Sequence, residues 1–164
     1  MKEKKLIRYG SFLRKKAKEV KSGPEIDKLI EEMKKILQEN EGVGLAAPQI
    51  GVSQRVIVVD TGEEGIYSFL NPEVREASEE KITTKEGCLS LKGVWLDVSR
   101  SEKLKVEAEN QEGEKILLEA EGILAVTFQH EIDHLNGKLF IDRVGFFKKM
   151  KALFSYYFKN EKPC

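Results

Sequence analysis

The 164-residue chain has little of several features that each mark a class of protein. With only two cysteines, Cys88 and Cys164, it is not built as a disulfide scaffold. Its apolar runs are far shorter than the roughly 20 residues of a membrane span, and the N-terminal MKEKKLIRYG lacks a signal-peptide core. Net charge is absent too, because 28 basic and 28 acidic residues cancel, which argues against a surface made for DNA or acidic membranes. We therefore expect a cytoplasmic protein without DNA or membrane partners.

The spacing of apolar residues changes twice along the chain. Spacings of three and four between residues 26 and 37 predict an amphipathic helix that ends near Gly42. Helical spacing returns over 122–136, and a last helix is predicted at 146–160. Between them lie short β-rich runs, at 56–59, 66–70, 94–98, 104–108 and 116–118. Since no repeat or linker appears, we expect residues 1–164 to form one α+β domain, with antiparallel sheets packed around a central helix at 122–136.

The string His130-Glu131-Ile132-Asp133-His134 carries the clearest chemistry. On a helix, residues four apart lie on one side about one turn apart, so both imidazoles can bind one metal ion. Glu131 points about 100° away and can instead reach a water on that ion as a base. The same string also occurs by chance on solvated helices. Here the chain contains only these two histidines, which favours a metal-binding helix.

A catalytic site of this type needs a third protein ligand and an open fourth position. No further histidine exists, so Cys88, the one internal thiol, is the best candidate, although a lone cysteine is often only a small buried apolar residue. Glu79, Glu80 and Glu86 are the alternative ligands. We also predict that Glu86 and Arg100 form a bidentate pair that supports the backbone near Cys88, the alternative being two unrelated surface charges.

Residues 42–49, Gly-Val-Gly-Leu-Ala-Ala-Pro-Gln, form the third informative stretch. Its small residues allow the backbone to pass close to another chain or a ligand, and Gln49 supplies an amide donor. The stretch is not a phosphate-binding loop, because it lacks the Lys-Ser/Thr pair. Taken alone, such a segment is most often a tight packing turn.

Together, these stretches resemble the three signature motifs of peptide deformylases, in the family's order. The motifs are GVGLAAPQ at 42–49, EGCLS at 86–90 and QHEIDHLNG at 129–137, and the similarity extends from Leu13 to Asp142. The resemblance implies a metal-dependent hydrolase that removes the formyl group from the initiator formyl-methionine of nascent polypeptides and releases formate. An H-E-x-x-H metalloprotease is the alternative enzyme. A degenerate metal-binding protein docked on ribosomes is a further alternative, although it would be expected to have lost Glu131 or Gln49.

The resemblance also assigns roles to individual residues. Cys88, His130 and His134 are implied ligands of one divalent ion, usually Fe²⁺, which Zn²⁺, Ni²⁺ or Co²⁺ can replace. Glu131 is implied as the base that later protonates the leaving amine. The Gln49 side chain and the backbone N–H of Leu89 are the implied donors to the developing oxyanion.

Substrate contacts follow from the same resemblance. An extended peptide should lie between the chain around Val43 and Gly44 and that around Gly87. The substrate methionine should enter an apolar pocket built partly by Ile123 and Val126, whose alternative role is core packing. Trp95 departs from the family pattern, because some relatives have an arginine near the substrate at this position.

The C-terminal segment concentrates positive charge. Residues 143–164 hold six basic side chains and one acidic side chain, a net +5, so the rest of the chain must be −5. Related deformylases use a C-terminal helix to contact the ribosome, and the basic charge here would favour ribosomal RNA. The apolar stripe of the same helix is explained equally well by packing on the domain.

Overall fold

The structure, a computed structural model, describes residues 5–62 and 64–160. It contains two antiparallel sheets and three α-helices, the α+β fold expected from the sequence. The helices are α1 (Pro24–Glu39), α2 (Gly122–Leu135) and α3 (Phe146–Asn160). The larger sheet, in spatial order, consists of β1 (Gly44–Ala46), β2 (Val56–Asp60), β3 (Ile66–Ala77), β6 (Lys103–Glu109) and β7 (Lys115–Glu121). The smaller sheet pairs β4 (Lys81–Glu86) with β5 (Leu96–Ser101).

Helix α1 forms because its first position is Pro24, which is preorganised for a helix, and because its apolar residues share one face. That face is buried against β2 and the 3-10 turn at Ala47–Ile50. Packing on this turn helps to hold the segment in which β1 and Gln49 lie. The helix predicted over 26–37 is thus confirmed.

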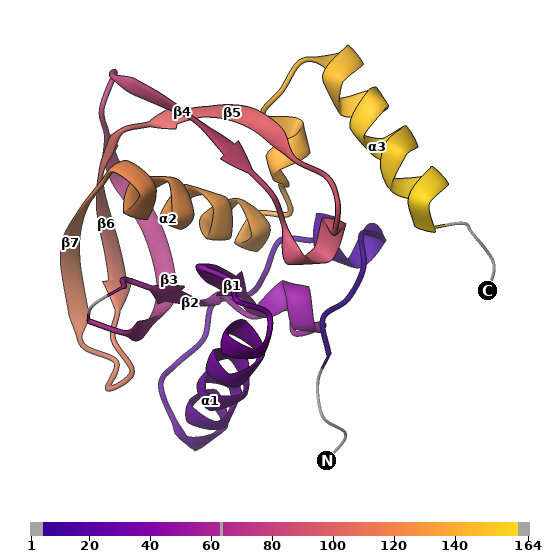
Figure 1. The fold of residues 1–164 in the computed structure, drawn as a ribbon. Helices are drawn as coiled ribbons and strands as arrows, with labels where there is room; N and C mark the ends of the chain where they lie inside the picture. Colours follow the sequence, from indigo (N-terminus) through magenta and orange to yellow (C-terminus); the bar gives the residue numbers. More distant parts are fainter. Residues whose placement is uncertain (1–4, 63, 161–164) are drawn as a thin grey trace.

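Helix α2 runs between the two sheets (Figure 1). Consequently it is buried on nearly every side from Ala125 to Leu135, polar residues included. One side contributes Phe128 and Leu135 to a cluster with the larger sheet. The H-E-x-x-H string therefore lies in the interior of the molecule, where its ionisable groups are removed from water.

The predicted strands at 56–59, 66–70, 104–108 and 116–118 correspond to β2, β3, β6 and β7. The strand predicted at 94–98 corresponds to β5 but was placed two residues too early, because a 3-10 turn at Leu89–Leu91 and a left-handed Gly93 delay the strand until Leu96. Sequence analysis missed β4, whose alternating side chains are mostly charged or hydroxylated and leave no apolar face. It also treated β1 as part of a packing turn.

Helix α3 stands outside both sheets (Figure 1). It is attached through Ala152 and Tyr156, which are buried in a cluster with Leu13 and Leu139. Much of its remaining surface is apolar and exposed, including Phe147 and Phe154. Within the residues described, no helix combines the length and apolar character needed to cross a membrane.

We predict that Gly137→Ala strongly destabilises the fold. Gly137 ends α2 in the left-handed region, with φ +69°, and an added methyl group would lie 2.7 Å from the Arg14 carbonyl carbon. Strain and overlap together should lower the free energy of unfolding by about 2–4 kcal/mol, measured by urea denaturation. Gly145→Ala is the control, since that methyl group would meet no atom within 4 Å. A loss below about 0.5 kcal/mol for Gly137→Ala would contradict the prediction.

Candidate active site

Cys88, His130 and His134 converge at the C-terminal half of α2. One ligand atom from each lies within 4.8 Å of the others, and Cys88 Sγ is 3.3 Å from His134 Nε2. Cys88 comes from the segment after β4, whereas the histidines are one turn apart on α2. Among the described residues this is the one such group of three, and a thiolate with two imidazoles is a donor set for zinc and related transition metals. The residues present therefore fit a metal ion.

The two imidazoles differ in their proton affinity. Burial lowers the pKa of His134 well below its ordinary value, and the neighbouring His130 lowers it further. Burial also lowers the pKa of His130, but contacts with Cys88 and Glu86 raise it to about 10. His134 is therefore neutral with a lone pair available, while an ion that binds His130 must displace a proton.

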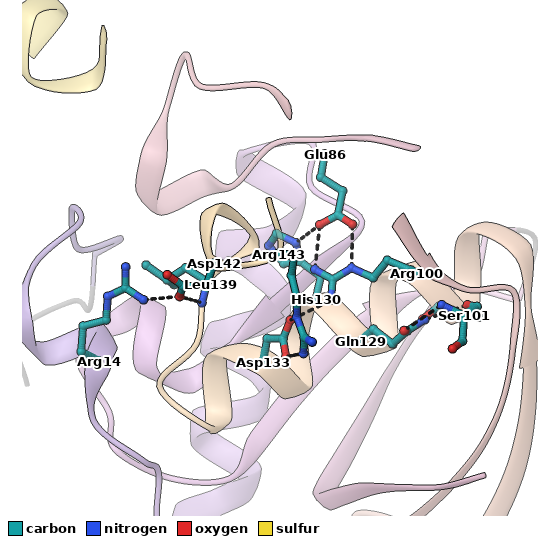
Figure 2. Close-up of polar contacts among 11 residues, drawn as sticks. Arg14, Glu86, Arg100, Ser101, Gln129, His130, Asp133, Leu139, Asp142 and Arg143 are labelled. Carbon is teal, nitrogen blue, oxygen red and sulfur yellow. Dashed lines mark hydrogen bonds and ion pairs between the residues drawn. The ribbon is translucent and has the colours of Figure 1, made fainter. Parts of the chain in front are cut away.

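Glu86 orients the His130 ring. Its Oε2 lies 2.8 Å from His130 Nδ1, which leaves the other ring nitrogen for an ion (Figure 2). Burial alone would raise the pKa of Glu86, but hydrogen bonds from Arg100 and His130 lower it to about 2. The carboxylate is therefore charged at neutral pH, as a histidine-orienting partner needs to be.

Arg100 holds Glu86 with the bidentate geometry predicted from the sequence. Its Nε donates to Glu86 Oε1 at 2.7 Å and its Nη2 to Oε2 at 2.9 Å, and the guanidinium is 3% exposed (Figure 2). The third nitrogen, Nη1, donates to Asp133 Oδ2 at 2.7 Å. The predicted Glu86–Arg100 pair is confirmed. Arg100 also connects β5 to α2 through its contact with Asp133.

Asp133 and Arg143 extend this network and were missed by sequence analysis. Arg143 donates both from Nε, at 2.9 Å, and from Nη2 to the Asp133 carboxylate. A signal was present, because Asp133 lies on a helix in which Phe128, Ile132 and Leu135 recur at apolar spacing, which predicts burial. A carboxylate on a buried helix face requires a cationic partner.

Two of the alternative metal ligands are excluded by their position. Glu79 and Glu80 lie in the turn between β3 and β4, outside the Cys88, His130 and His134 group. The third, Glu86, contacts a histidine ring rather than joining the group of ligand atoms.

Glu131 lies beside β1. It is 3% exposed, and its Oε2 has no partner among the described residues. Burial raises the pKa of its carboxyl to about 7. Gly44 permits this arrangement, since a methyl group there would lie 2.7 Å from Glu131 Oε1 and 2.9 Å from its Cγ. A carboxylate of this pKa exchanges protons readily near neutral pH.

Gln49 presents a donor beside Cys88, and Leu89 is the residue that follows Cys88. The Gln49 side chain is 1% exposed; its Oε1 accepts the Ala46 N–H at 2.8 Å and its Nε2 donates to Cys88 Sγ at 3.5 Å. The amide nitrogen is thereby directed at the thiol. Leu89 begins the 3-10 turn after Cys88, so its backbone N–H is one that the turn does not use.

Strand β1 is an edge strand with one free side. The Val43 carbonyl accepts the Asp60 N–H, so it is occupied within the sheet. The Ala46 N–H points the other way, to Gln49. Because alternate residues of a strand face the same side, the N–H and C=O of Gly44 point away from β2. Gly44 therefore offers its main-chain groups on the open side of β1, whereas the Val43 carbonyl does not.

The remaining predicted substrate-binding residues differ widely in how much of their surface is exposed. Val126 is buried on α2, whereas Ile123, one turn earlier, and Val43 are 61% and 60% exposed. Gly87 precedes Cys88 and is covered by the Trp95 ring, which a methyl group on Gly87 would meet at 2.8 Å.

Comparisons with known proteins give one consistent result. A family model described as polypeptide deformylase matches residues 3–150. The chain is 50% identical over 141 residues to a peptide deformylase of Carboxydothermus hydrogenoformans, covering 85% of this chain and 91% of the relative. It is 49% identical over 132 residues to that of Natranaerobius thermophilus, covering 80% and 85%. The crystal structure of peptide deformylase from Ehrlichia chaffeensis in complex with actinonin matches with a TM-score of 0.91 at 33% identity, covering 99% of this chain and all of that one (100%).

We predict that Cys88→Ser binds Zn²⁺ or Co²⁺ at least about a hundredfold more weakly, because a hydroxyl is a poor anionic ligand. Titration with either ion, followed by metal analysis, measures the change. Cys164→Ser removes the other cysteine of the chain and should leave affinity unaltered. Equal metal content in the two variants would remove Cys88 from the ligand set.

The buried pair of Glu86 and Arg100 gives a second prediction. Glu86→Gln and Arg100→Gln should each weaken metal affinity by about 10–100-fold, because both leave His130 without its oriented partner. Since the two residues act through one contact, the double variant should lose less than the product of the two single losses. Simple additivity in this cycle would show that the pair does not support the metal centre.

Proposed function

The chain belongs to the polypeptide deformylase family, and from this we propose which of its residues carry out the reaction. It is a metal-dependent hydrolase that removes the N-formyl group from nascent polypeptides. The H-E-x-x-H metalloprotease alternative is not favoured. The observation that carries the assignment of roles is the convergence of Cys88, His130 and His134 beside the buried Glu131.

Cys88, His130 and His134 would hold one divalent ion. We propose Fe²⁺ as the working ion, with Zn²⁺, Ni²⁺ or Co²⁺ as replacements, because a thiolate and two imidazoles suit all of them. When bound, the ion supplies the positive charge that polarises a formyl carbonyl and lowers the pKa of a water molecule. Glu86 would keep the His130 ring turned toward it, supported by their 2.8 Å contact.

Glu131 would take a proton from the attacking water and pass it to the departing amine. Its burial and its pKa of about 7 support its action first as a base and then as an acid, because such a carboxyl can both accept and release a proton at neutral pH. Gly44 leaves the carboxylate the room it needs. An amine leaves only once it is protonated, so the same carboxyl serves the bond-breaking step.

Gln49 and Leu89 would stabilise the developing oxyanion. The Gln49 amide is held from behind by the Ala46 N–H, so its NH₂ is already oriented before substrate arrives. The Leu89 N–H is supplied by the backbone at the start of a turn. Donors that are fixed in advance contribute most, and removal of one typically costs about a hundredfold or more in rate.

The substrate would add an extended strand to the open side of β1. Gly44 would exchange main-chain hydrogen bonds with it, with Gly87 on its other side, so that recognition would be independent of most side chains. The substrate methionine would enter a pocket near Val126, with Val43 and Ile123 at its exposed margin. We propose that residues 1–164 form a single catalytic domain acting in the cytoplasm, where nascent chains are made.

Helix α3 would contact the ribosome. Two basic residues are already paired within the protein, Arg143 with Asp133 and Lys149 with Asp142. Lys148 and Lys151 have no ion pair among the described residues, so their charges are available to bind RNA. Glu161 and Lys162 lie outside the described residues. The exposed lysines of α3 would supply the attraction to ribosomal RNA.

We predict that Glu131→Gln retains its metal while turnover of a formyl-Met peptide falls by at least about a hundredfold, because shape is kept and the base is lost. Formate release and metal content are measured on the same preparation. Loss of the metal would assign Glu131 a ligand role, and near-normal turnover would remove it from the mechanism.

For the ribosome contact we predict that Lys148→Glu combined with Lys151→Glu abolishes salt-sensitive co-sedimentation with ribosomes. Lys21→Glu with Lys28→Glu is the control, because these exposed lysines lie at and before α1, far from α3 (Figure 1). Both variants change the net charge equally. Equal sedimentation of the two would show that α3 does not bind ribosomes through its charge.

A further inference from the structure

A groove separates the start of β5 from α3. It has a volume of about 370 Å³, with Val94, Trp95 and Asp97 on one wall and Lys148, Lys151 and Ala152 on the other. Val94 and Ala152 also belong to a buried cluster, so each wall contains one apolar residue that is anchored in the core. No role proposed above uses this groove for a peptide.

Trp95 connects the groove to the active site. Its indole is 62% exposed, a large apolar area to leave in water. One part of the ring rests on Gly87, so closely that a methyl group there would lie between 2.8 and 3.0 Å from three ring atoms. Gly87 directly precedes Cys88. The same side chain therefore bounds the strand beside the metal ligands and the groove that leads to α3.

The far wall of the groove is positively charged. Lys148, Lys151 and Ser155 follow one another at spacings of three and four, so they share one side of α3. Neither lysine has an ion pair among residues 5–62 and 64–160, whereas Lys149 on the adjoining side pairs with Asp142. Asp97 is the one acidic residue on the groove, which leaves a net charge of +1.

We propose that this groove binds the part of the formylated polypeptide that follows the residues paired with β1, with a preference for acidic side chains. The inference rests on the extended substrate binding proposed above. Strand β1 has three residues, so it can pair with only about 10 Å of extended chain. A longer chain leaving Gly87 meets the indole of Trp95, which packs on backbone and apolar groups, and then the two ammonium groups, which attract carboxylates.

The test compares full-length, metal-loaded enzyme on three substrates. Two are formyl-Met octapeptides that share their first three residues and carry three Glu or three Lys in the remainder; the third is the shared formyl-Met tripeptide. Formate release gives kcat and KM. The acidic octapeptide should have a KM about fivefold below that of the basic one, and 0.5 M salt should reduce this difference, as expected of exposed charges.

Variants locate the preference. Lys148→Glu with Lys151→Glu should reverse the ratio of the two octapeptide KM values, and Lys148→Gln with Lys151→Gln should bring it to about one. Lys21→Glu with Lys28→Glu makes the same charge change on another surface and should preserve the ratio. Trp95→Ala should raise the KM of both octapeptides more than that of the tripeptide, and Trp95→Phe should restore most of the loss.

Failure of the groove proposal and failure of the proposed catalytic roles would give different results. The proposed role of the groove would be overturned by equal KM values for the two octapeptides in the unmodified enzyme. It would also be overturned by a preference that survives Lys148→Glu with Lys151→Glu. A tripeptide that is not deformylated by the unmodified enzyme would instead count against the catalytic roles proposed above. Octapeptide kinetics without any preference, together with ribosome binding lost in the lysine variants, would assign this face of α3 to RNA alone.

Discussion

The centre of the molecule depends on one buried guanidinium. Arg100 joins Glu86 at the end of β4 to Asp133 on α2, so the position of the small sheet relative to the helix is set by charge as well as by packing. Removal of one partner from such a buried network leaves an uncompensated charge and typically costs about 3–5 kcal/mol. Apolar contacts are non-directional, so by themselves they would fix the sheet on α2 less specifically. The guanidinium, with fixed donor directions, admits a single register.

That register decides where the proposed metal ligands meet. Cys88 lies two residues beyond Glu86, and His130 lies three before Asp133, so both ligands are tied closely to the two ends of the Arg100 bridge. The opposite side of α2 is constrained differently, by the close approach of Gly44 to Glu131. Ion pairs thus hold the ligand side and steric fit holds the carboxylate side. The helix between them has little freedom to rotate.

The sequence predicts this site better than it predicts the sheets. Periodic apolar residues identify α1 and α2, and the lone internal cysteine with two histidines identifies the three side chains that converge. Strand β4 escapes such analysis because Lys81, Thr83 and Lys85 alternate with Ile82, Thr84 and Glu86, of which only Ile82 is apolar, so no apolar period exists. Pairings such as Asp133 with Arg143 depend on tertiary position, which spacing along the chain does not reveal. The occupied carbonyl of Val43 likewise follows from the register of β1 with β2.

The shortness of β1 has a consequence for when a nascent chain can be deformylated. Under the strand pairing proposed above, the substrate must reach this three-residue edge while extended over about 10 Å from its formyl group, with its backbone hydrogen-bonding groups still unpaired. A polypeptide whose N-terminus has already joined a helix or a sheet does not meet that condition. On that proposal, deformylation would compete with the folding of the substrate. Proteins whose first residues become structured early have the narrowest interval in which this edge can capture them.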